Sequence, residues 1–190
     1  MRATRTATFE FPWKIALAGV VVVAFVGLIA YAVWAATRPV VLPGVEVPIM
    51  NNIFHIQPGE PHEPYNSDPP TSGQHWVEPA EAGFYSSAPA DEQLIHNLEH
   101  GYVVIYYNCT ALDESRCTAL KDGIRDTMAE AGNTELTRTP KTIAAPRPGM
   151  DAQVAATSWG RLYKSSELDR QELLTFIQDF RNLAPEGNIP

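Results

Sequence analysis

The chain has 190 residues, which is enough for one membrane segment and one domain of ordinary size. Its 16 prolines and 12 glycines predict many turns, while a hydrophobic content of 45% excludes a disordered protein. The net charge of -8 is unevenly spread, because residues 39–115 contain eleven carboxylates and all five histidines but no lysine or arginine. This pattern excludes a basic nucleic-acid-binding surface there and favours cations as ligands.

The first predicted element is an apolar segment from Ile15 to Ala36 that contains no charged residue. About 20 apolar residues cross the hydrocarbon core of a bilayer as a helix, whereas the apolar core of a signal peptide usually has only about 7–15. Three basic residues precede the segment and one follows it closely, namely Arg2, Arg5, Lys14 and Arg38. By the positive-inside rule we expect a cytoplasmic tail over residues 1–14, a single transmembrane helix over residues 15–36 and an exported remainder.

Residues 37–70 are predicted to form a proline-rich arm. Eight prolines interrupt this stretch too often for a long helix. Short edge strands are expected within it at residues 45–47 and 53–56. Residues 71–190 are then expected to form one exported domain with both helices and strands.

The regular structure of this domain is predicted to begin with a short helix that opens at Asp91 and ends at Gly101. An anion suits the first turn of a helix, and glycine suits its C-terminal end. The apolar face of this helix consists of Leu94, Ile95 and Leu98. Enrichment in β-branched and aromatic residues then predicts a buried strand over residues 102–107.

Two longer helices are predicted to flank two further strands. Asp113 is expected to cap a helix that runs to Ala131, and Ser166 is expected to cap the last helix. Strands are expected at residues 142–145 and 154–159, with residues 161–163 as an extension of the second. The order after residue 102 is then β-α-β-β-α, which gives an α+β fold. The C-terminal part of thioredoxin-like folds has the same order, so a thioredoxin-like domain is predicted by topological analogy.

Several motifs in the exported part resemble a known protein family. They are PPTSGQHW at residues 69–76, GFY at 83–85, LIHNLEHG at 94–101, the strand leading to Cys109, PGM at 148–150 and TSWGR at 157–161. On these motifs the chain is similar to the DUF3105 family of uncharacterised bacterial proteins, over essentially the whole exported part. The resemblance implies a bacterial domain that is anchored in the cytoplasmic membrane and exported. It implies no catalytic residue.

The chain contains two cysteines, Cys109 at the end of the predicted strand and Cys117 in the first turns of the helix after it. An even cysteine count in an exported domain predicts a structural disulfide. Thiol-disulfide exchange is the alternative, but that chemistry normally uses two cysteines separated by two residues at the start of a helix. Seven residues separate the cysteines here, so we favour the structural disulfide.

The strongest candidate site lies at the end of the short helix. His96 and His100 are four residues apart, so both imidazoles project from one face of a helix, and Glu99 lies near that face. This spacing is how helices present pairs of metal ligands. Asn97 stands where zinc proteases of the His-Glu-x-x-His type carry their general base, so that chemistry is disfavoured.

A metal site needs further ligands beyond these two histidines. His75 is predicted as the third ligand, because it lies in an ordered turn motif. Met150 is predicted as a possible fourth ligand, and a thioether there would favour copper over zinc. His55 and His62 are the reserve candidates for a metal ligand. The alternative is that the histidines only form hydrogen bonds with backbone groups.

The sequence therefore predicts a non-catalytic, membrane-anchored module outside the cytoplasm that binds copper or zinc through its histidines. No catalytic residue is assigned, and we expect a binding protein rather than an enzyme. Two alternatives remain open. One is an accessory subunit that binds a membrane-protein partner through the arm, and the other is a thiol-disulfide exchange protein.

Overall fold

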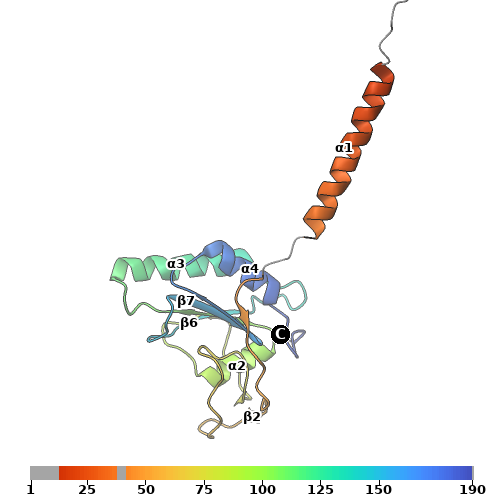
Figure 1. Ribbon diagram of the computed structural model, residues 1–190. Coiled ribbons are helices and arrows are strands. Elements are labelled where there is room, and N and C mark those ends of the chain that lie inside the picture. The colour runs from red at the N-terminus through yellow and green to blue at the C-terminus, as the bar shows by residue number, and fades with distance from the viewer. Residues whose placement is uncertain (1–12, 38–41, 190) are drawn as a thin grey trace, which may run out of the picture. The chain divides into compact units, whose positions relative to one another are not determined.

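The computed structural model describes residues 13–37 and 42–189 and separates the chain into two units, Met1–Val41 and Leu42–Pro190. Figure 1 shows both units. The predicted cytoplasmic tail lies outside the described residues over positions 1–12, as does Arg38.

The first unit contains one long helix, α1, at Trp13–Ala36. It has 24 residues, which corresponds to about 36 Å of helix, and that length is sufficient to cross the hydrocarbon core of a bilayer. Within the described parts of the chain, it is the one helix long and apolar enough for a membrane span. Its length and composition support a membrane anchor, by a test that a signal sequence near the N-terminus also passes.

The second unit is built on a six-stranded mixed sheet with the strand order β1-β8-β7-β5-β6-β4. Strands β4, β5 and β6 are parallel to one another, and β7, β8 and β1 continue the sheet with antiparallel pairings. The strands are β1 Val45–Glu46, β4 Gly83–Phe84, β5 Val103–Tyr107, β6 Thr142–Pro146, β7 Val154–Ser158 and β8 Arg161–Ser165. A mixed α+β domain is therefore confirmed.

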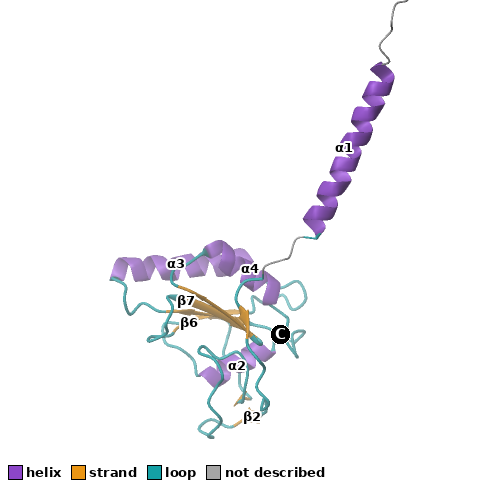
Figure 2. Ribbon diagram, viewed as in Figure 1, coloured by secondary structure: helices purple, strands orange, loops and turns teal. Residues whose placement is uncertain are grey.

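Helices cover both faces of this sheet (Figures 1 and 2). Alternate residues of a strand point to opposite faces, and β5 is buried on both of them. Val103 and Ile105 pack with α3 (Glu114–Ala131) and α4 (Arg170–Phe180). Val104 and Tyr106 pack with α2 (Asp91–Glu99) on the other face. The sheet is thus the middle layer of three.

The predicted β-α-β-β-α order is wrong by one strand. Residues 161–163 do not extend the preceding strand but belong to β8, which pairs antiparallel with β7 and brings Ser158 opposite Arg161. The two-residue turn between them contains Gly160 with a φ of 71°, a left-handed conformation that glycine adopts without steric cost. The observed order after residue 102 is β-α-β-β-β-α.

Of the two predicted helix caps, one agrees with the structure and one does not. Asp113 caps α3, because its side chain accepts a hydrogen bond of 2.8 Å from the N–H of Arg116, as predicted. The last helix is capped by Asp169 and not by Ser166, since the Asp169 side chain accepts from the N–H of Glu172 at 2.9 Å. Strand β8 continues to Ser165, which leaves Ser166 in the connection between strand and helix.

The predicted disulfide is present. Cys109 and Cys117 are joined, and their Cα atoms lie 5.3 Å apart. The bridge ties the chain after β5 to the first turn of α3 and lies beside the core formed with α4. The disulfide therefore lies on the face of the sheet that α3 and α4 cover.

Beside α2, on the opposite side of the sheet, lie two more short strands from the chain before α2. Strand β2 (His55–Ile56) pairs in parallel with β3 (His75–Trp76) in a separate two-stranded sheet. Arg147 fastens this region to α2, because its guanidinium bonds Asp68 at 2.7 Å and Asp91 at 2.8 and 3.1 Å. We refer to residues 53–77, which contain β2 and β3, as the arm face of the domain, because β3 packs beside α2.

Candidate metal centre

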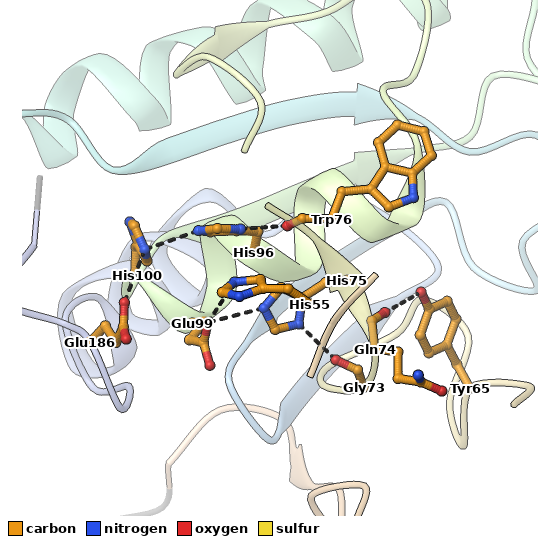
Figure 3. Close-up of polar contacts among 10 residues, drawn as sticks. All are labelled: His55, Tyr65, Gly73, Gln74, His75, Trp76, His96, Glu99, His100 and Glu186. Atoms are coloured by element: carbon orange, nitrogen blue, oxygen red, sulfur yellow. Dashed lines mark hydrogen bonds and ion pairs between the residues drawn. The ribbon is translucent and has the colours of Figure 1, made fainter. Parts of the chain in front are cut away.

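Three histidines from separate elements meet on the arm face (Figure 3). They are His55 on β2, His75 on β3 and His96 on α2. Each offers one ring nitrogen, and these three atoms all lie within 4.8 Å of one another. Residues 41 positions apart in the sequence thus contribute to one cluster of potential metal ligands.

Backbone pairing and helix packing bring the three rings together. The parallel register of β2 and β3 places His55 directly opposite His75. The rings of His55 and His96 are stacked with centroids 5.0 Å apart, and the ring of His75 meets both of them edge-on. His75 and His96 are buried, whereas the side chain of His55 is 48% exposed. The cluster therefore has two fixed ligands and one at the surface.

Hydrogen bonds to the backbone orient both buried rings. The Nδ1 atom of His75 lies 2.8 Å from the carbonyl oxygen of Gly73, and that of His96 lies 2.5 Å from the carbonyl oxygen of Trp76. A carbonyl oxygen can only accept, so each ring carries its proton on Nδ1 and keeps a lone pair on Nε2. Metal-binding histidines are oriented in this way by outer partners. Backbone bonding therefore uses one nitrogen of each ring and leaves the other available.

A buried carboxylate stands beside this lone pair. Oε2 of Glu99 lies 3.0 Å from Nε2 of His75 and 3.9 Å from Nε2 of His55. With the His75 proton on Nδ1, both atoms of the 3.0 Å contact are acceptors, so a second proton or a cation is needed between them. Burial lowers the pKa of His75, against the opposing effects of the Gly73 carbonyl and Glu99, which disfavours the second proton. A bound cation would satisfy both groups.

The predicted ligand His100 lies next to this triad. Its Nε2 is 3.1 Å from Nε2 of His96 and 3.2 Å from Oε2 of Glu186. The triad whose nitrogens lie within 4.8 Å contains His55, the residue held in reserve, in the place expected for His100. The helical spacing of His96 and His100 favoured His100 as a ligand, and no sequence pattern indicated that β2 pairs with β3.

The other two candidates lie elsewhere. The side chain of Met150 is buried in the core under α2, together with Leu94 and Tyr106. Met150 as a ligand stays a prediction that these contacts do not test. His62 bonds Glu92 at 3.2 Å, and its ring lies against Tyr65.

Asn97, on the turn of helix between the two histidines, has a structural role. Its side-chain oxygen accepts from the N–H of Ala80 at 2.9 Å, and its NH₂ group donates to the carbonyl of Ala80 at 2.8 Å. This pair of bonds holds the loop after β3 on α2. Glu186, in contrast, was missed by sequence reasoning, because it lies 86 residues after His100 in a segment without a motif.

Comparison with known proteins yields one match. A family model described as a protein of unknown function (DUF3105) matches residues 55–190, which is more than half of the chain. The match begins at His55, so the whole triad lies within it. No curated protein and no solved structure matches the chain.

Proposed function

The chain belongs to the DUF3105 family, whose description assigns no activity, and we propose that it is a membrane-anchored module that binds one zinc or copper(II) ion. The ligands are His55, His75 and His96. The ion is held on the arm face of the domain, with two buried ligands and one exposed ligand.

The observation that carries this proposal is the approach of three imidazole nitrogens to within 4.8 Å. Tetrahedral zinc with bonds of about 2.0–2.1 Å keeps its ligand nitrogens about 3.3 Å apart. The rings must therefore close by at most about 1.5 Å. The exposed ring of His55 is the one that can move, because the rings of His75 and His96 are held by backbone carbonyls.

The donor set favours a borderline divalent ion. Imidazole nitrogens suit zinc and copper(II), whereas copper(I) is selected by thiolates and thioethers. Both cysteines are joined in the disulfide, and Met150 is buried in the core under α2. Glu99 supplies a carboxylate for the fourth position or for an ordered water there. The surplus of carboxylates in residues 39–115 attracts cations to this side.

We propose that the domain lies outside the cytoplasm of a bacterium. Helix α1 supports a single-pass anchor, and the basic residues that precede it support a cytoplasmic N-terminus. The disulfide supports an oxidising compartment, because cytoplasmic thiols are kept reduced.

The thioredoxin-like interpretation is kept as a proposal about the core. In its favour, β5 and β6 are parallel, β7 and β8 are antiparallel neighbours, and α3 and α4 lie on one face. A disulfide also follows β5 directly. Its loop is wider than that of known exchange motifs, so we assign it a structural role.

A second candidate function is binding of a membrane-protein partner, and one observation favours it. A groove of about 770 Å³ lies beside β1 and α4. Its apolar lining comes mainly from Leu42, Val47, Ile49, Trp159, Phe180 and Leu183. Co-purification of a stoichiometric partner from membranes in mild detergent would support this function.

Elemental analysis of the full chain, purified in mild detergent, tests the metal proposal. We expect about one equivalent of zinc or copper after loading and removal of excess metal. The double variant His75→Ala, His96→Ala should lose it, with affinity reduced by more than about 100-fold, because outer partners alone are worth 10–100-fold. His62→Ala is the matched control, since His62 bonds Glu92 outside the triad. Wild-type protein that cannot be loaded would overturn the proposal.

A further inference from the structure

The lone pair of His96 that would bind the metal already has a neighbour. The proton of His96 is on Nδ1, which bonds the carbonyl of Trp76, so Nε2 is the available acceptor. Nε2 of His100 lies 3.1 Å away. When no ion lies between them, two imidazole nitrogens at this distance share one N–H and one lone pair, and His100 is then the donor. His100 therefore competes with a metal ion for the same lone pair.

A second acceptor faces the same N–H of His100. Oε2 of Glu186 lies 3.2 Å from Nε2 of His100, on the side away from the triad, as Figure 3 shows. The N–H of His100 thus lies between two acceptors, the proposed metal ligand His96 and the carboxylate of Glu186, which is not a proposed ligand. When the N–H donates fully to Glu186, the lone pair of His96 is released.

Glu186 is held in place by its own backbone. Its N–H donates to the carbonyl of Glu99 at 3.0 Å, which fixes the C-terminal segment to the end of α2. The buried ammonium of Lys141 strengthens this junction, because it donates to the carbonyls of His100 and Gly187, both at 2.8 Å. The segment also approaches very closely, since a Cβ on Gly101 would lie 2.7 Å from the Cα of Asn182. This junction fixes the backbone from which the half-exposed side chain of Glu186 reaches His100.

We propose that His100 is a gate on the metal centre and that Glu186 holds this gate open. His100 is then no ligand but a competitor for the lone pair of His96, and Glu186 is a positioning residue that draws the N–H of His100 away. This inference rests on the proposed metal binding, and it reverses the role that the sequence predicts for His100.

The gate is tested by the affinity of the full chain in detergent for Zn²⁺, measured against a chromophoric chelator. His100→Ala should bind Zn²⁺ up to about tenfold more tightly, because the competing hydrogen bond is gone. Glu186→Ala should bind about tenfold more weakly, because the N–H of His100 then donates fully to the lone pair of His96 that the metal needs. Glu186→Gln keeps an acceptor and should restore part of the affinity. His100→Phe keeps the ring volume without an N–H and checks the alanine variant.

The double variant His100→Ala, Glu186→Ala separates the gate from a simple charge effect. With the gate removed, loss of Glu186 should change Zn²⁺ affinity less than about twofold. A loss that persists in the His100→Ala background would show that the carboxylate acts only through its charge, and would overturn the inference. Weaker binding by His100→Ala would also overturn it, because His100 would then be a ligand. In both cases the wild-type chain still binds Zn²⁺, so the proposed function survives. Wild-type protein without affinity for Zn²⁺ would remove the proposed function as well.

Discussion

The two faces of the central sheet are built in different ways. On one face, α3 and α4 bury a continuous apolar core against alternate residues of β5, β6 and β7. On the other face, α2 packs over a second apolar core, and beside it lies the arm face with its two-residue strands β2 and β3. The histidine triad lies on this second face. Apolar packing thus stabilises both faces, but only the second also gathers polar side chains from distant parts of the described chain.

This difference leads to a specific expectation for the two faces. Changes on the face of α3 and α4 should lower the free energy of unfolding and leave the metal affinity of the folded protein unchanged. Changes on the arm face should have smaller effects on unfolding and larger effects on metal affinity. Each variant below is therefore measured twice, by urea denaturation and by Zn²⁺ titration of the full chain in detergent.

The largest effect on stability is expected from Phe176→Ala. Phe176 is fully buried in the core between α4 and the sheet, and its ring packs on Tyr163 and Phe180. Removing a buried phenylalanine side chain costs about 3–5 kcal/mol, from lost burial and the cavity left behind. Gln178→Ala on the exposed side of the same helix is the control, with a change below about 0.5 kcal/mol. A fall in the Zn²⁺ affinity of folded Phe176→Ala protein would contradict the independence of the two faces.

The residues of this face follow a helical period in the sequence. Leu120, Ile124 and Met128 recur at helical spacing, and the structure buries the first two and packs the third against the core. Helical stripes are local patterns, since each needs only the next turn of the same helix. The turn at Gly160 was missed, because the apolar residues on both sides of it were taken for a single strand.

The arm face was harder to predict for a physical reason. His75 and His96 were proposed as ligands from the sequence and lie in the cluster, whereas His55 enters it through the parallel pairing of two strands of two residues each. Such short strands have no periodicity to detect. The contact between His100 and Glu186 depends on the packing of the C-terminal segment against the end of α2, which no local pattern specifies.

An intermediate effect is expected when the disulfide is removed. Cys109 and Cys117 are eight positions apart, and closing a loop of this size in the unfolded chain is worth about 2–3 kcal/mol in the chain-entropy model. The double variant Cys109→Ser, Cys117→Ser should lose this stability and keep the Zn²⁺ affinity of the wild type. Ser115→Ala, at an exposed position of the same loop, is the control. Two reactive thiols in native wild-type protein would show that the bridge is not structural.

The smallest change in stability, with a measurable change in metal affinity, is expected from Arg147→Ala. The Arg147 guanidinium joins Asp68 of the arm face to Asp91 at the start of α2, and the arginine side chain is 23% exposed. Loss of these partly screened bonds should cost about 1–2 kcal/mol.

The effect of Arg147→Ala on Zn²⁺ follows from what the bonds to Asp68 and Asp91 hold together. Without them the arm is free to move relative to α2, and β2 with His55 moves with it. If the triad is then assembled in only a third of the molecules, Zn²⁺ binds about threefold more weakly. Arg116→Ala is the matched control, because it removes an exposed pair with Asp113 within one helix and should change neither quantity by much. Equal Zn²⁺ affinities for Arg147→Ala and Arg116→Ala would contradict this expectation. They would show that the packing of β3 against α2 assembles the triad without the bonds from Arg147 to Asp68 and Asp91.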